Sequence, residues 1–253
     1  PPPPPFAPPP TPVPSWSHPA PAPFAYRALA LGVAFAASPL FVDSFQGFDP
    51  NQFPVPQDEP PGQPAGYAFS IWGLIYLWLI VGMGYGALRA ARDGQWNDMR
   101  LPLCLSLAVG CTWLAVAVMS PVWAAVLIWI MLVTALMALF LAPAEDGLWA
   151  AAPVGLYAGW LSAASCVSLA LLAGGYGFFD EVTAALVFVG LAALLGLIVQ
   201  TALGRAPTYG IAVIWGLIGV VVTNWGETPA VAYLALGGSV LVALPTLRAF
   251  RKG

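Results

Sequence analysis

The segment from residue 60 to residue 92 constrains the fold more than any other part of the chain. It reads PPGQPAGYAFSIWGLIYLWLIVGMGYGALRAAR, so a proline-rich turn leads into an uncharged apolar run that ends at Arg89 and Arg92. A run of about 20 apolar residues is long enough to cross the hydrocarbon layer of a bilayer as a helix. The segment therefore predicts a membrane-spanning helix over residues 67–88, around which the other apolar segments pack.

The composition supports the same class of protein. Hydrophobic residues make up 60% of the chain and charged residues 8%, which excludes an ordinary soluble domain and leaves too few basic residues to bind nucleic acid. Because backbone polar groups in lipid must bond within their own segment, the spans are expected to be helices. We predict an all-α integral membrane protein with eight transmembrane helices, the other seven at 28–42, 101–119, 122–142, 149–173, 182–203, 208–225 and 230–247.

The basic residues fix the predicted orientation. With eight spans, all of them fall on the side of the two termini: Arg27, Arg89, Arg92, Arg100, Arg205, Arg248, Arg251 and Lys252. Lysine and arginine near span ends favour the cytoplasmic side. We therefore predict a multi-pass protein of the bacterial inner membrane with both termini in the cytoplasm, and this topology assigns residues 89–100, Trp96 included, to a cytoplasmic loop.

Residues 1–26 have a different composition. They are dominated by proline and alanine and open with five consecutive prolines, which predicts a polyproline II or unstructured arm. Two interpretations stay open. The arm is a flexible tail, or it is a strap that docks on a second copy or on a partner in a membrane complex through Phe6, Trp16, Phe24 and Tyr26.

The interiors of the predicted spans carry no charged residue, and the one histidine, His18, lies outside them. Ion-coupled transporters and proton pumps keep ionisable groups inside the membrane, and acid–base catalysis needs them as well. We therefore predict no catalytic residue, no enzymatic activity and no metal site. Cys104, Cys111 and Cys166 all fall in apolar runs and are expected to be small buried hydrophobic residues.

Tryptophan is the distinctive residue of the spans. Indole rings at span ends are explained by the headgroup-level aromatic belt, but Trp72, Trp113, Trp160 and Trp215 lie several residues inside their helices. They either pack the bundle or line a pocket for a flat apolar ligand. Polar side chains are few, and three of them recur every third residue on the span 149–173 as a narrow stripe: Ser162, Ser165 and Ser168.

One internal repeat suggests a further alternative. The sequence IWGLI occurs at 71–75 and again at 214–218, each time with a proline eight residues before the tryptophan (Pro64 and Pro207). The two copies would cross the membrane in opposite directions. Inverted repeats are typical of secondary transporters with a site near the midplane, so a transporter of a small hydrophobic molecule is one alternative function.

The run Pro60-Pro61 to Tyr67-Ala-Phe-Ser-Ile-Trp72-Gly-Leu-Ile-Tyr76 resembles the second helix of tryptophan-rich sensory proteins, the translocator protein (TspO/MBR) family. Two further runs resemble the third-helix and fifth-helix motifs of that family: Cys111-Thr-Trp113, in which Gly110 stands where an asparagine is usual, and Tyr157-Ala-Gly-Trp160-Leu-Ser-Ala-Ala164. The resemblance covers about residues 28–173. It implies a TspO-like five-helix region over 27–174, followed by three additional transmembrane helices over 175–253.

The resemblance also implies a function. It implies binding of a tetrapyrrole such as haem or protoporphyrin, with a sensory or regulatory role in pigment metabolism. The expected ligand contacts are Trp72, Tyr76, Trp113 and Trp160, with polar contacts from Ser162 and Ser165. From a different class, a structural accessory subunit of a larger membrane complex, pigment-containing photosynthetic complexes included, stays open as the first alternative, and the transporter as the second.

Overall fold

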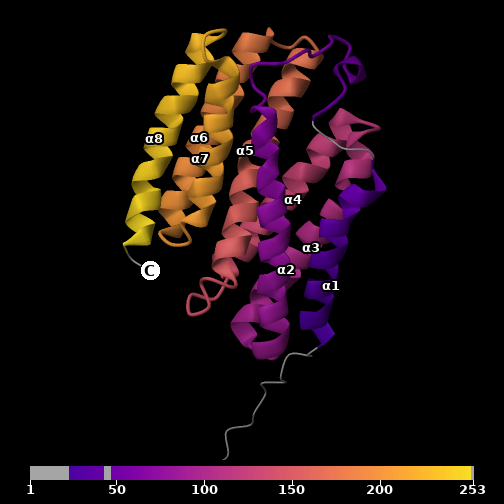
Figure 1. Cartoon of the computed structure of the whole chain (residues 1–253), viewed down its shortest axis with the longest axis vertical. Coiled ribbons are helices and arrows are strands. Elements are labelled where there is room, and N and C mark those ends of the chain that lie inside the picture. The colour runs from indigo at the N-terminus through magenta and orange to yellow at the C-terminus, as the bar shows by residue number, and fades with distance from the viewer. Residues whose placement is uncertain (1–22, 43–46, 252–253) are drawn as a thin grey trace, which may run out of the picture.

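The computed structural model describes residues 23–42 and 47–251. This part of the chain folds into a bundle of eight α-helices (Figure 1), which confirms the predicted all-α membrane fold. The helices are α1 Pro23–Ala37, α2 Ile71–Arg89, α3 Gly94–Ala117, α4 Pro121–Leu141, α5 Ala151–Gly175, α6 Glu181–Leu203, α7 Thr208–Asn224 and α8 Pro229–Phe250. Three short 3₁₀ helices accompany them: η1 Ser38–Phe41, η2 Pro50–Gln52 and η3 Gly66–Ser70.

The helices have the lengths that a bilayer requires. With η1 and η3 continuing α1 and α2, seven of the described helices are at least 18 residues long and apolar enough to cross a membrane. The remaining helix, α7, has 17 residues. At 1.5 Å per residue it is about 25 Å long, which is at the lower limit for a spanning helix.

Local sequence sets where several helices begin and end. The side chains of Asp93, Ser120 and Asp180 each accept a hydrogen bond from the backbone N–H three residues later, so they cap α3, α4 and α6. These caps satisfy N–H groups that the first helical turn leaves free. At the other end of α6, Gly204 adopts φ +62°, a left-handed conformation that glycine accepts without steric cost.

The most buried helix, α5, is the centre of the bundle. Inside the molecule, 78% of its span is buried, against 28–44% for the other long spans. It packs against α2, α4, α6 and α7, so helices α1–α4 and helices α6–α8 lie on two sides of it (Figure 1). Close approach to α7 depends on Gly155 and Gly159. A Cβ at Gly159 would collide with the carbonyl oxygen of Tyr209, so small residues at this spacing let the two helices approach closely.

The described chain begins and ends at the same end of the bundle (Figure 1), as eight crossings require. The α2–α3 and α6–α7 connections lie at this end too, because helices alternate in direction. The described arginines therefore all belong to this end, which we call the basic end, and the α1–α2 connection lies at the opposite end.

The structure corrects the predicted loop at residues 89–100. Helix α3 already begins at Gly94, so Trp96 and Arg100 belong to it rather than to a loop. Both side chains are 1% exposed. The Trp96 indole donates a 2.8 Å hydrogen bond to Asp146. The Arg100 guanidinium lies over the Trp96 ring and donates to the carbonyls of Gly86, Ala90 and Ala91 at the end of α2. Trp96 therefore ties α3 to the α4–α5 connection, and Arg100 ties α3 to the end of α2, and neither side chain faces water.

The predicted N-terminal arm is shorter than expected at its inner end. Helix α1 begins at Pro23, so Phe24 and Tyr26 belong to a helix and not to the arm. The arm residues Phe6 and Trp16 lie outside the described residues.

The connection from residue 47 to residue 65 runs across the end of the bundle opposite the basic end (Figure 1). Backbone hydrogen bonds tie it to two helices, from Val55 to Gly175 of α5 and from Ala65 to Gly219 of α7. The Asn224 side chain donates a further bond to the carbonyl of Pro61. The connection is therefore a fixed cover over α5 and α7, and it positions η3 and the start of α2.

Candidate ligand-binding cavities

A cavity of about 370 Å³ lies between α1, α2, α3, α4 and α5, in the half of the bundle away from the basic end. We call it the aromatic chamber. Its volume falls within the roughly 300–1,000 Å³ of small-molecule sites. The described residues that line it carry no charge: Phe35, Pro39, Val42, Phe69, Trp72, Tyr76, Gly110, Trp113, Leu114, Ile128, Met131, Trp160, Leu161 and Ala164.

Four of the six predicted site residues meet in this chamber. Trp72 and Tyr76, one helical turn apart on α2, stack with ring centroids 5.4 Å apart and planes at 20°. Trp160 from α5 stands edge-on to Trp72 at 6.3 Å and 86°. Trp113 from α3 lines the same space, and its indole N–H donates a 2.9 Å hydrogen bond to the carbonyl of Ala124 on α4. The chamber therefore presents flat ring faces and ring edges from three helices.

Phe35 supplies a wall that the sequence did not predict. Its ring packs edge-on against Trp72 at 5.9 Å and Tyr76 at 5.1 Å. Gly110 makes this position possible, because a Cβ there would lie 2.6 Å from the Phe35 ring. With glycine at position 110, α1 approaches α3 here and the Phe35 ring lines the chamber.

Ser162 and Ser165 do not line the aromatic chamber. The Ser162 hydroxyl donates to the carbonyl of Ala158 and accepts from the hydroxyl of Tyr209 on α7, both at 2.9 Å. Ser165 is directed to the carbonyl of Ile128 on α4 at 3.5 Å. Ser162 and Ser165 therefore connect α5 to α7 and α4, which is a common role of serine in membrane helices.

The remaining interior tryptophan, Trp215, also lies outside the chamber. Its indole N–H donates a 2.9 Å hydrogen bond to the carbonyl of Ala68, and its ring packs edge-on against Tyr67. The second IWGLI copy, on α7, thus contacts the 3₁₀ helix that precedes the first copy. The two copies are connected here without facing a common cavity.

Comparison with known proteins places the chain in a family. The profile of the TSPO-like protein family matches residues 61–248, about three quarters of the 253 residues. The chain belongs to the TSPO-like protein family. Comparison with the curated proteins and with the solved structures gave no match.

The family match and the geometry concern the same helices. The matched residues run from the loop before α2 into α8, so they include Trp72, Tyr76, Trp113 and Trp160. They extend beyond residue 173, where the resemblance in the sequence ends, and they do not include residues 28–60. TSPO-like proteins are generally non-enzymatic membrane proteins. The matched region of this TSPO-like protein therefore contains the aromatic residues that α2, α3 and α5 contribute to the chamber, but not Phe35 of α1. It also contains α6, α7 and most of α8.

Proposed function

We propose that this TSPO-like protein is a sensory or regulatory membrane protein that binds a flat hydrophobic ligand of the tetrapyrrole class in the aromatic chamber. The observation that carries the proposal is the convergence of Trp72, Tyr76, Trp113 and Trp160 on one uncharged cavity. Stacked and edge-on aromatic rings provide a large apolar surface with defined geometry, which suits a flat conjugated ring.

One unpartnered polar group supports ligand binding. The Trp160 side chain is 2% exposed, and its indole N–H has no hydrogen-bond partner among the described residues. A buried donor without a partner costs about 1–3 kcal/mol. We therefore propose the Trp160 N–H, in place of Ser162 and Ser165, as the polar contact of a ligand that carries a carbonyl or another acceptor.

The lining residues also limit what the ligand contains. They offer ring faces, the Tyr76 hydroxyl, the Met131 thioether and indole N–H groups, but neither the histidine nor the thiolate that holds haem iron in globins, peroxidases and P450s. A porphyrin without a metal fits this donor set better than haem. Binding by stacking and apolar burial, without covalent chemistry, is the mechanism we propose.

The test is a titration of the purified protein with protoporphyrin IX in detergent micelles, followed by quenching of tryptophan fluorescence and by the porphyrin absorption band. We expect saturable binding that weakens about tenfold in Trp72→Phe and Trp160→Phe, because each substitution removes stacking area and the second also removes the donor. The matched control is Trp123→Phe, since Trp123 is 64% exposed outside the chamber. Equal affinity in all four proteins would refute the proposal.

We also propose that the basic end faces the cytoplasm. The described arginines gather at that end, which is the pattern of cytoplasmic loops. Labelling of single introduced cysteines in intact cells tests this orientation. A membrane-impermeant maleimide should label a cysteine at residue 58, in the α1–α2 connection, and should not label one at residue 145, in the α4–α5 connection; the reverse pattern would refute it.

The two alternative functions, an accessory subunit and a transporter, can be tested separately. An accessory subunit would co-purify with other chains after gentle detergent extraction, and a transporter would move its substrate across proteoliposomes. The side-chain observations above favour neither over ligand binding.

A further inference from the structure

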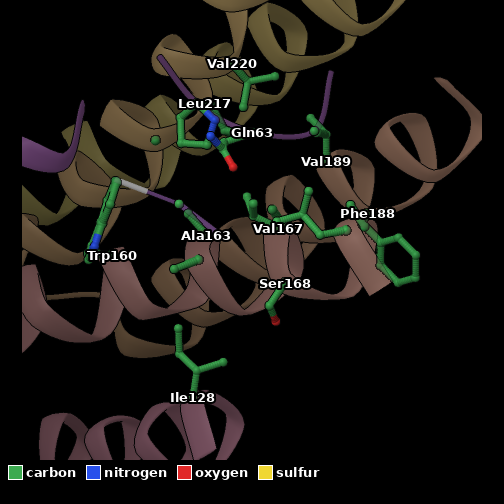
Figure 2. A pocket seen from close by; sticks show the side chains of 18 of the residues that line it. Gln63, Ile128, Trp160, Ala163, Val167, Ser168, Phe188, Val189, Leu217 and Val220 are labelled. Atoms are coloured by element: carbon green, nitrogen blue, oxygen red, sulfur yellow. The ribbon is translucent and has the colours of Figure 1, made fainter. Parts of the chain in front are cut away.

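A second cavity lies beside the aromatic chamber, on the α6–α7 side of α5. We call it the side chamber. Most of its walls come from α5, α6, α7 and the connection 47–65, with single residues from η3, α3 and α4. Val167, Val189, Leu217 and Val220 point into it (Figure 2). Neither Trp72 nor Tyr76 lines it.

The two chambers share a wall. The residues common to both are Phe69, Trp113, Ile128, Trp160 and Ala164. Its aromatic members are Phe69, Trp113 and Trp160, and the rings of Phe69 and Trp160 stand edge-on at 5.9 Å. In Figure 2 the Trp160 ring lies at one edge of the side chamber with its nitrogen directed away from the other lining side chains. A ligand in the aromatic chamber therefore lies directly beside the side chamber.

The side chamber is too small for a second ring. Its volume is about 70 Å³ against about 370 Å³ for the aromatic chamber, or about one fifth. The space is bordered by small residues where α5 meets α7, because Ala163 and Gly216 face each other there and neither has a side chain large enough to fill it. A narrow, flexible chain fits such a space, whereas a flat macrocycle does not.

The wall of the side chamber is almost entirely apolar. Its two polar side chains are Gln63, from the connection, and Ser168, whose hydroxyl already donates a 2.7 Å hydrogen bond to the carbonyl of Ser165. The occupant that suits these walls is a hydrocarbon.

Charge distribution adds a second condition on the ligand. No arginine lines either chamber among the described residues. Arg89, at the far end of α2, is 17 residues from Trp72, or about 26 Å along the helix. Burying a carboxylate without a partner is costly, so the chambers favour a ligand whose acidic groups are absent or esterified.

We propose that the natural ligand is a flat ring carrying a long hydrocarbon tail and no free carboxylate, with the ring in the aromatic chamber and the first part of the tail in the side chamber. Esterified tetrapyrroles and prenylated quinones share this chemistry. The inference rests on the proposed ring-binding function and adds the chemical class of the ligand. The rest of the tail passes the half-buried Phe188, at the edge of the side chamber in Figure 2, toward the lipid.

The experiment compares probes that differ in the tail alone. Methyl pheophorbide a and pheophytin a have the same ring and both are esters, but only the second carries a phytyl chain. Menadione and menaquinone-4 form the corresponding quinone pair. Dissociation constants are measured in detergent micelles, where the tail of a free probe is already in an apolar environment, so a preference for the tailed probe reports packing inside the protein. In whichever pair binds, we expect the dissociation constant of the tailed probe to be about tenfold lower than that of the tailless probe.

Val167→Phe fills the side chamber, because Val167 lines it and does not line the aromatic chamber. This variant should lose the preference for the tailed probe and keep its affinity for the tailless one, which also shows that it has folded. The matched control is Val187→Phe on α6, where the side chain is 47% exposed on the outside of the bundle. It should keep the tenfold preference.

A third pair tests the condition on charge. Protoporphyrin IX dimethyl ester should bind at least as tightly as protoporphyrin IX, and much tighter binding of the free acid would overturn this part of the inference. Equal binding of tailed and tailless probes, with ring binding intact, would overturn the tail site and leave the proposed function standing. If none of the tetrapyrrole probes binds, the tetrapyrrole proposal fails, and the tail site is then tested by the quinone pair alone. If none of the probes binds, both proposals fail.

Discussion

The hydrogen bond between Ser162 on α5 and Tyr209 on α7 leads to a prediction in which the two partners are not equivalent. Both side chains are fully buried. The single proton of the Ser162 hydroxyl goes to the carbonyl of Ala158, so Tyr209 must donate to Ser162. Removing the tyrosine hydroxyl leaves Ser162 with its backbone partner, whereas removing the serine hydroxyl leaves Tyr209 with a buried donor and no acceptor.

The magnitudes follow from this asymmetry. Hydrogen bonds between membrane helices contribute about 0.6 kcal/mol on average and up to about 1.7 kcal/mol, so Tyr209→Phe should lower the free energy of unfolding by about 0.6 kcal/mol. Ser162→Ala should lower it by about 1–2 kcal/mol, because an unsatisfied buried hydroxyl is more costly than a lost bond. The double variant should resemble Tyr209→Phe, since neither orphan group remains.

The assay is equilibrium unfolding in mixed detergent and SDS micelles, followed by helical circular dichroism, with the four proteins forming a double-mutant cycle. Protoporphyrin IX affinity is measured alongside and should not change in Ser162→Ala, because Ser162 lies outside the aromatic chamber. The reasoning is refuted if Tyr209→Phe costs as much as Ser162→Ala, or if the double variant loses the sum of the two.

Three further predictions concern stability. Gly159→Ala should lower the melting temperature sharply, since a Cβ there collides with the backbone of α7, whereas Gly237→Ala, with open space around it, should not. Arg100→Ala should destabilise the protein in the same melting assay, with partial recovery in Arg100→Lys, because the guanidinium serves several carbonyls at the end of α2 and an ammonium reaches fewer of them. Hydrogen bonds from Thr183 hold the pKa of Asp180 below its usual value. The Asp180 carboxylate therefore stabilises the fold above about pH 4, and this contribution is lost as the pH falls through the lowered pKa. The melting temperature of Asp180→Asn should depend less on pH in that range than the melting temperature of the parent protein.

The sequence was sufficient for the spans because their signal is local. Each apolar run is long enough to cross lipid whatever it packs against, and charges confined to the connections determine how many times the chain crosses. The beginning of α3 was not visible in the same way. Residues 94–100 are polar enough to resemble a loop, and only their contacts with α2 and with Asp146 keep Trp96 and Arg100 buried in a helix.

The candidate site was predictable in part for a similar reason. Trp72, Tyr76, Trp113 and Trp160 were singled out by their depth within the spans and by the resemblance, and they do line one cavity. Ser162 lies as deep in its span as a residue that contacts a ligand would, but the rotation of α5 about its axis determines which neighbour its side chain meets. In the structure that neighbour is Tyr209 on α7 and not the chamber. The side chamber depends on where Ala163 and Gly216 meet across that interface, a pairing that no single-sequence pattern contains.

The central position of α5 has a consequence for how the protein is made. Ribosomes deliver the helices in chain order, so α1–α4 enter the bilayer before the helix that packs against α2 and α4 has been synthesised. The four early helices already have surfaces that pack on one another, α1 on α2 and α3, and α3 on α4. The helix at residues 151–175 then supplies the surface on which α6 and α7 dock, and α8 packs on those two helices. A chain that ends before residue 151 would lack α5 and therefore Trp160, so Trp72, Tyr76 and Trp113 would border an open groove instead of a closed chamber.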